Sequence, residues 1–316
     1  MGRVAVKLQD KPVVSVVVPT RDRAHFLDDA LKSVMRATDR VATSCSTEVI
    51  VVDDWSTDST EEVAARYPIR FVKNRGSGVA AARNTGISTA RGTLIAFLDD
   101  DDIWFPHHLQ VHLDKRRMFP GVGITYSQGM LANEVLKPIS IPYPKSPLPN
   151  GWIQRYAFSA ALQQFNTMLT ERELFERVNC FDETLEVGED LDMIQKLAPC
   201  TEFAGIEEVT TLWRQHPRPG AGSYRGWRRR RRISQESYKR GLAYLGTGLP
   251  LRARLARQVQ GRGWAAFEAV VEGERCLRHG QRAEAAKLLL AAIGVSAPHA
   301  FFRIPGFWRF AARVLL

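Results

Sequence analysis

A run of five apolar residues, Leu94 to Leu98, ends abruptly in four consecutive aspartates, Asp99 to Asp102. An unbroken apolar run of this length is typical of a strand buried on both faces, as in a parallel sheet covered by helices. The aspartates then lie at the carboxyl edge of the strand, where open α/β sheets bind their ligands. Carboxylates this close together repel one another unless a cation or protons intervene, so the run predicts a divalent metal. The alternative is a solvated turn in which Asp102 caps the following helix.

Three more strands are predicted before this run, over residues 13–18, 48–52 and 69–72. A helix follows each of them, and Ser59 is expected to open the second helix through a capping box with Glu62. This alternation of strands and helices predicts a parallel, doubly wound sheet. After Trp104 the pattern is less regular, with helices predicted near 107–118, 152–163 and 172–178 and two short strands near 203–206 and 209–213.

The basic charge of the chain is concentrated in its last third. The formal net charge is +10 over 316 residues, yet residues 223–316 hold 19 Lys and Arg against 5 Asp and Glu. Five arginines follow one another from Arg228 to Arg232. We therefore place a boundary near residue 222 and expect the basic region, with a helical hairpin turning at Gly280, to meet phosphate groups. Residues 301–316 are aromatic and basic, which suits either an interfacial anchor or a helix docked on a core.

The four cysteines, Cys45, Cys180, Cys200 and Cys276, have no metal-ligand spacing and argue against a zinc site. The N-terminus lacks the apolar run of a signal peptide, and no stretch approaches the roughly 20 apolar residues of a membrane span. We therefore expect a cytoplasmic protein with reduced thiols.

Five segments resemble, in order, the motifs of family 2 glycosyltransferases with the GT-A fold. They are VSVVVPTRDR (14–23), VVDDWST (51–57), GVAAARNTG (78–86), FLDDDDIW (97–104) and GEDLDM (188–193), within roughly residues 12–216. Trp55 stands where the family commonly has glycine. The resemblance implies an α/β GT-A fold, with a mostly parallel central sheet flanked by helices and a C-terminal helical appendage. It assigns residues 1–106 to a nucleotide-sugar-binding half, 107–222 to an acceptor-binding half and 223–316 to a basic helical region.

The resemblance also implies a donor site at the ends of the first strands. The family seats the base and ribose near Pro19, Thr20 and Arg21, and Asp53 would accept a hydrogen bond from a uracil or thymine imide, with Asp54 close behind. Gly78 would let the backbone approach the nucleotide, unless it only starts a helix. Arg83 would neutralise phosphate or contact the nucleotide, unless it is a surface helix residue.

The metal site implied by the resemblance is an aspartate-any-aspartate element at Asp99, Asp100 and Asp101. Asp101 is the preferred ligand of Mg²⁺ or Mn²⁺, because hard cations prefer oxygen ligands. Asp99 would contact the ribose or metal-bound water, and Asp102 is expected to cap a helix. His216 follows the last predicted strand. It would be a metal ligand, a phosphate contact or a surface residue.

Asp190 is the expected general base, because inversion in one displacement needs a carboxylate beside the acceptor hydroxyl. The alternative role for Asp190 is that of a helix N-cap. Glu189 would orient Asp190 or hold the acceptor. The expected partners are a UDP- or dTDP-type nucleotide-sugar donor, a glycan or lipid-linked acceptor of cell-surface polysaccharide or glycolipid synthesis, and anionic membrane at residues 223–316. A catalytically silent module of the same fold is one alternative. A basic nucleic-acid-binding protein is another, although no nucleic acid is expected because charge alone is non-specific.

Overall fold

The computed structural model describes residues 13–144, 146–153, 164–185 and 188–215, and further along 240, 269–270, 273, 276–277, 280–295 and 311–314. The chain divides into two compact units, residues 1–215 and 216–316. The first unit contains the sheet and all the predicted site residues except His216, which lies outside the described residues.

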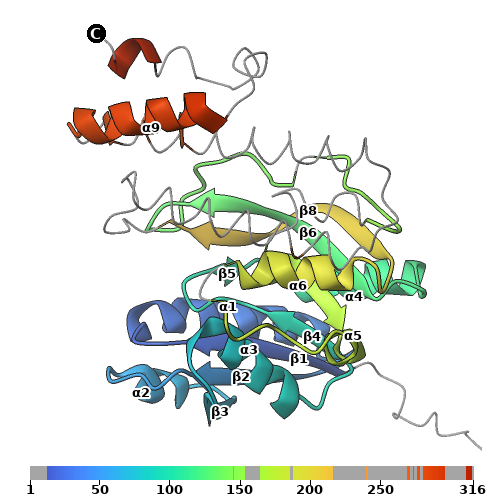
Figure 1. Ribbon diagram of the computed structural model, residues 1–316. Coiled ribbons are helices and arrows are strands. Elements are labelled where there is room, and N and C mark those ends of the chain that lie inside the picture. Colours follow the sequence, from blue (N-terminus) through green and yellow to red (C-terminus); the bar gives the residue numbers. More distant parts are fainter. Residues whose placement is uncertain are drawn as a thin grey trace, which may run out of the picture. The chain divides into compact units, whose positions relative to one another are not determined.

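The first unit is built on an eight-stranded sheet with the order β3-β2-β1-β4-β7-β6-β8-β5 (Figure 1). Strands β3, β2, β1 and β4 run parallel to one another, β7 is antiparallel to both β4 and β6, and β8 is parallel to β6. The strands are β1 (Val13–Thr20), β2 (Ser46–Asp53), β3 (Arg70–Lys73), β4 (Leu94–Phe97), β5 (Ile103–Trp104), β6 (Ile124–Ala132), β7 (Met168–Glu171) and β8 (Phe203–Arg214).

Helices cover both faces of this sheet, because its strands carry apolar side chains at successive positions. In β2, Val49 and Val51 belong to an apolar cluster that includes residues of α1, α2 and α4, whereas Ile50 and Val52 belong to a second cluster that includes residues of α3, α5 and α6. Successive strand residues point to opposite faces, so a continuous apolar strand requires cover on both. The helices are α1 (Ala24–Val41), α2 (Thr60–Ala64), α3 (Gly78–Thr89), α4 (His108–Met118), α5 (Arg172–Arg177) and α6 (Glu189–Leu197).

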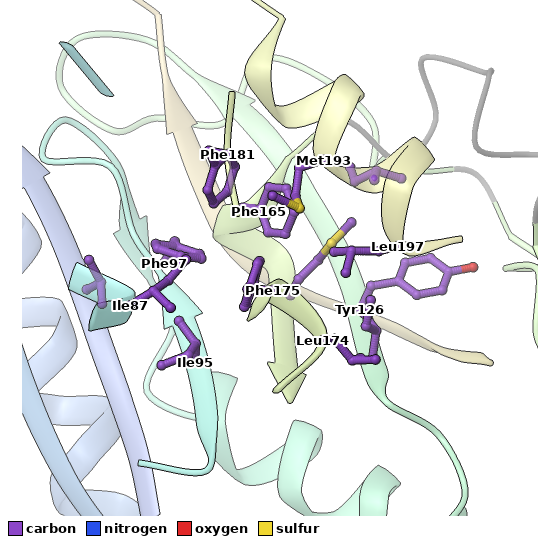
Figure 2. Close-up of a cluster of buried hydrophobic side chains, with 14 of the residues drawn as sticks. Ile87, Ile95, Phe97, Tyr126, Phe165, Leu174, Phe175, Phe181, Met193 and Leu197 are labelled. Carbon is purple, nitrogen blue, oxygen red and sulfur yellow. The ribbon is translucent and has the colours of Figure 1, made fainter. Parts of the chain in front are cut away.

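A cluster of phenylalanines joins the parallel half of the sheet to the later half (Figure 2). Phe97, at the end of β4, meets Phe165, Phe175 and Phe181 edge-on, with ring centroids 5.7–5.8 Å apart. Met193 and Leu197 of α6 pack into the same cluster. This apolar contact fixes α6 near the end of β4, which is where the sequence predicts the metal site.

The structure confirms the four predicted strands that form β1 to β4 and the helices that form α4 and α5, while the predicted helix near 152–163 lies largely outside the described residues. The two short strands predicted near 203–206 and 209–213 are wrong, since β8 is one strand of 12 residues. The predicted capping box is also wrong, because the Ser59 side chain makes no capping hydrogen bond. The carboxylate of Asp58 instead accepts the Thr60 N–H at 3.0 Å.

The second unit contains α9 (Arg282–Val295), which follows a turn at Gly280 with a φ of 72°. Residues 269–270, 273 and 276–277 before that turn are helical, as the predicted hairpin requires. Ala285, Leu288 and Ala292 of α9 pack against Val270 and Cys276. Among the described residues, no helix is long and apolar enough to cross a bilayer.

Candidate active site

Three parallel strands, β2, β1 and β4, bring the predicted donor and metal residues to one edge of the sheet. Thr20, the last residue of β1, is in register with Asp53, the last residue of β2. Pro19 lies inside β1 opposite Val52. The Asp99–Asp102 run begins two residues after the end of β4, at the same edge.

Alternate members of the aspartate run differ in their surroundings. Asp99 and Asp101 are partly exposed, whereas Asp100 and Asp102 are buried. Asp100 accepts hydrogen bonds from Thr20 Oγ1 at 2.7 Å and Arg23 Nη1 at 3.0 Å. Burial and the charge of Asp101 raise the pKa of Asp100 to about 7, although Arg23 and Thr20 act in the opposite direction. Asp100 therefore fastens the run to β1 and to the loop that follows it.

Asp102 does not cap a helix, which corrects the expectation from sequence. Its carboxylate accepts the backbone N–H of Arg214 at 2.8 Å and the Asn166 side-chain amide at 2.5 Å, and β5 rather than a helix follows it. Burial, together with the charges of Asp99 and Asp101, raises the pKa of Asp102 well above its ordinary value. A raised carboxyl pKa in such a group marks a place where a bound cation would stabilise the ionised form.

One oxygen from each of Asp99, Asp101 and Asp102 lies within 4.8 Å of the others, a spacing that suits a shared cation. Carboxylate oxygens are the ligands that Mg²⁺ and Mn²⁺ prefer, so these residues fit the predicted ions. Asp100 lies outside this group, whereas Asp102, which the sequence reasoning did not count as a ligand, belongs to it. Arg23, on the loop after β1, donates to Asp101 at 2.8 Å and offsets part of the negative charge.

Arg83 of α3 is a buried link between the aspartate run and α6, which rules out the surface-helix alternative. Only 2% of the residue is exposed. Its guanidinium donates to Asp99 Oδ1 at 3.0 Å, Glu189 Oε1 at 2.9 Å and Asp190 Oδ1 at 2.5 Å. These three carboxylates together raise the pKa of Arg83 despite its burial. The rings of Phe97 and Phe181 lie 5.8 and 5.5 Å from the guanidinium carbon. Arg83 thus fixes the distance between Asp99, one of the three clustered aspartates, and Asp190.

Asp190 lies in the first turn of α6, which begins after Gly188 at a φ of 87°. Gly188 is the N-cap, so Asp190 does not cap the helix. Burial and the nearby charges of Glu189 and Asp99 raise the pKa of Asp190 well above its ordinary value, against the effect of Arg83 and the Phe165 N–H. A carboxylate with a raised pKa is a stronger proton acceptor once ionised, and Arg83 favours that ionised form.

Asp53 and Asp54 are both engaged by protein groups. Asp53 accepts from Lys73 Nζ at 2.7 Å and the Ser56 N–H at 3.1 Å. Asp54 accepts from the Gly78 N–H at 3.0 Å, where α3 begins at a φ of 85°, and from Arg21 Nη1 at 3.3 Å. Asp54 therefore stabilises the start of α3, because an anion there offsets the positive end of the helix dipole.

Trp55 adopts a φ of 62°, which explains why glycine is favoured at this position of the motif. A left-handed backbone costs roughly 1–2 kcal/mol for a residue with a Cβ. The indole is not buried in return, since 60% of Trp55 is exposed. The carboxylate of Asp22 accepts the Thr57 N–H at 2.7 Å, and the Asp22 N–H donates to Ser56 Oγ at 2.8 Å, which holds the turn.

Sequence reasoning missed two residues that support the aspartate run. Asn166 donates its side-chain amide to Asp99 at 3.2 Å and to Asp102, and accepts the Asp99 N–H at 3.3 Å. Arg214 donates through Nε to the Asp101 carbonyl at 2.9 Å. Asn166 stands in no motif and carried no signal. Arg214 lies two residues before His216, so the sequence indicates that it is near the site. The sequence does not indicate which residues it contacts.

Comparisons with known proteins identify the family of this chain. The profile of Glycosyl transferase family 2 matches residues 15–117. A putative colanic acid biosynthesis glycosyl transferase, WcaA of Escherichia coli, is 31% identical over 216 residues, which cover 65% of this chain and 73% of that protein. The chain belongs to glycosyl transferase family 2. An uncharacterized glycosyltransferase from Rickettsia conorii is 28% identical over 201 residues. The aligned region covers 62% of this chain but only 32% of that relative.

Two solved structures share the GT-A fold of this family 2 chain. Staphylococcus aureus TarS in complex with UDP-GlcNAc superposes with a TM-score of 0.59 at 15% identity, covering 96% of this chain and 88% of TarS. The mannosyltransferase PcManGT of Pyrobaculum calidifontis, in complex with GDP-Man and Mn²⁺, gives 0.57 at 19% identity, covering 97% and 87%. At these identities the likeness shows the fold, a mixed α/β sheet flanked by helices.

Proposed function

We propose that this chain transfers a sugar from a nucleoside diphosphate donor to an acceptor hydroxyl, with inversion at the anomeric carbon. The observation that carries the proposal is the link, through buried Arg83, between the Asp99, Asp101 and Asp102 cluster and the carboxylate of Asp190. The cluster suits a cation that binds a diphosphate, and Asp190 suits a general base. An inverting displacement needs these two groups on either side of one anomeric carbon.

The residues divide the reaction between them. Mg²⁺ or Mn²⁺, held by Asp99, Asp101 and Asp102, would offset the charge on the leaving diphosphate. Asp190 accepts the proton of the acceptor hydroxyl while that oxygen bonds to the anomeric carbon and the bond from that carbon to the diphosphate breaks. Glu189 shares the guanidinium of Arg83 with Asp190, so it orients the base. The nucleoside diphosphate is the leaving group.

The donor and acceptor classes are part of the proposal. TarS with UDP-GlcNAc and PcManGT with GDP-Man support a nucleotide-sugar donor, and we favour a UDP or dTDP type. The relative WcaA is named for colanic acid biosynthesis, which supports a glycan or lipid-linked acceptor of a cell-surface polysaccharide or glycolipid. Peripheral contact of the basic region 223–316 with anionic membrane at the cytoplasmic face is proposed from its charge alone.

Two substitutions separate the roles of the proposed base and the metal cluster. Asp190→Asn should retain UDP binding in the presence of Mn²⁺. It should lower the rate at which UDP is released from the donor during transfer by about 10²–10⁴-fold, as expected for loss of a general base. Asp101→Asn should weaken Mn²⁺-dependent UDP binding itself. Asp114→Asn is the matched control, because Asp114 lies in α4 and is paired with Arg117 rather than with the site.

Titration calorimetry with UDP and Mn²⁺, followed by a UDP-release assay over a panel of UDP- and dTDP-sugars, measures both quantities. Undiminished turnover by Asp190→Asn would refute its role as the base. Nucleotide binding without turnover of any donor by the unchanged chain, across the panel and with added acceptors, would favour the catalytically silent alternative.

A further inference from the structure

Trp55 has an exposed ring on a strained backbone, and no contact among the described residues accounts for that combination. Its φ of 62° is costly for a side chain with a Cβ, and its exposed fraction of 60% means that burial does not compensate. The turn is held directly after Trp55, where the Asp22 N–H donates to Ser56 Oγ and the Asp22 carboxylate accepts the Thr57 N–H. Glycine would form the same turn without strain, so a tryptophan at this position lowers the stability of the fold. Strain of this kind gathers at ligand sites.

The order of the strands indicates where a nucleotide bound at the metal cluster would extend. The cluster follows β4, whose parallel neighbour is β1, and β2 lies beyond β1. Adjacent strands lie about 4.8 Å apart, so the end of β2 is roughly 10 Å from the end of β4. An extended nucleoside diphosphate covers such a span. On the other side of β4 the edge is occupied by the 3₁₀ turn Phe165–Thr167, where Asn166 binds Asp99 and Asp102.

We propose that Trp55 stacks on the base of the nucleoside diphosphate donor, an inference that rests on the proposed function. Trp55 is the aromatic residue of the two loops that follow β1 and β2, residues 21–23 and 54–59. Indole rings stack on nucleobases of any identity, because every base has a π face. Trp55 therefore supplies affinity for the nucleoside. The metal cluster supplies affinity for the diphosphate, and the two contributions are separable.

Base-containing and base-free ligands separate these contributions. The dissociation constants of UDP, dTDP and GDP, and of pyrophosphate as a probe without a base, are measured on the full chain with Mn²⁺. Trp55→Gly should weaken binding of the nucleotide that the unchanged chain binds best by about fivefold or more. It should leave pyrophosphate binding unchanged, and Trp55→Phe, which keeps a ring, should retain most of the nucleotide affinity. The Tm of Trp55→Gly should be equal to or above that of the unchanged chain, because glycine relieves the strain.

Trp152→Ala is the control for loss of an exposed indole. Trp152 has an exposed fraction of 51% and follows Gly151, which pairs with the first residue of β8 at the opposite edge of the sheet. It should not change either affinity. Equal nucleotide affinity in Trp55→Gly and the unchanged chain would overturn the inference, and so would an equal loss of pyrophosphate affinity. Failure of the unchanged chain to bind any of the three nucleotides would overturn the proposed function, and this inference with it.

Discussion

Acidification should destabilise the first unit through two buried histidines of α4, His108 and His112. Neither residue has exposed surface, and their ring centroids lie 4.6 Å apart. Burial and the charge of Arg116 lower the pKa of His112 to about 3. Burial and the neighbouring histidines His112 and His107 lower the pKa of His108 well below its ordinary value. In the unfolded chain both imidazoles take up protons near the ordinary pKa of about 6.5.

The contribution of the two uncharged histidines to the free energy of unfolding is fully present above about pH 6.5. It is lost as the pH falls, because the unfolded chain then binds protons that the folded chain does not. Each such proton is worth about 1.4 kcal/mol per pH unit. Between about pH 7.5 and about pH 5, His112 therefore lowers the free energy of unfolding by about 2 kcal/mol, and His108 lowers it further in the same direction. The Nδ1 atoms are held by Thr210 and Thr125 at 2.8 Å, and neither Nε2 has a hydrogen-bond partner among the described residues, so the rings have no acceptor for a second proton.

Urea unfolding followed by circular dichroism at the two pH values measures this loss. His112→Asn, which keeps a polar atom near the position of Nδ1, should be less stable at both pH values but should lose about 2 kcal/mol less on acidification than the unchanged chain. The double variant with His108→Asn should lose less stability on acidification than the His112→Asn variant does. His25→Asn is the control, because His25 is exposed and should leave the loss unchanged. The same pH dependence in the double variant and the unchanged chain would refute the reasoning.

Two further predictions concern residues that hold the site together. Asn166→Ala should raise the Mn²⁺ concentration needed for half-maximal UDP binding by about 10–100-fold, because Asn166 orients two of the three cluster carboxylates. A metal titration would show this, and an unchanged midpoint would argue against the orienting role. Arg83→Met should lower the free energy of unfolding at neutral pH by about 3–5 kcal/mol, because Asp99, Glu189 and Asp190 lose their shared cation. Urea unfolding checks this prediction, which fails if the stability is unchanged.

The parallel half of the sheet could be predicted because each of its features is local. The residues of β1, β2 and β4 are continuous apolar runs, and such runs identify strands covered on both faces. The position of the aspartates at the edge of the sheet follows from that local pattern. Their individual environments do not, because Asp102 is defined by partners 64 and 112 residues away, Asn166 and Arg214. Polarity alone made Asp102 resemble a helix cap.

The later half could be predicted only in part, because its strands are interrupted or short. Two consecutive glutamates, Glu207 and Glu208, divide the apolar run of β8, which is why the sequence suggested two strands. The structure passes over them at an irregularity, where Ser127 pairs with Ile206 and the next residue, Gln128, pairs with Val209. Strand β5 has two residues and is formed through its pairing with β8, which no local pattern indicates. In the same way, Asn166 reaches the cluster only because β7 joins the sheet beside β4.

Arg214 connects the end of β8 to the aspartate run and to two other parts of the first unit. Besides its bonds to Asp101 and Asp102, its guanidinium donates to Asp29 of α1 at 2.9 Å and to the carbonyl of Glu134 at 2.6 Å. The second unit begins two residues later, at position 216. A C-terminal truncation that reaches the end of β8 therefore removes hydrogen bonds that hold the aspartate run. A fragment that ends before residue 214 would leave the Asp102 carboxylate without its backbone donor, so a minimal catalytic fragment must include Arg214 even if the whole basic region is removed.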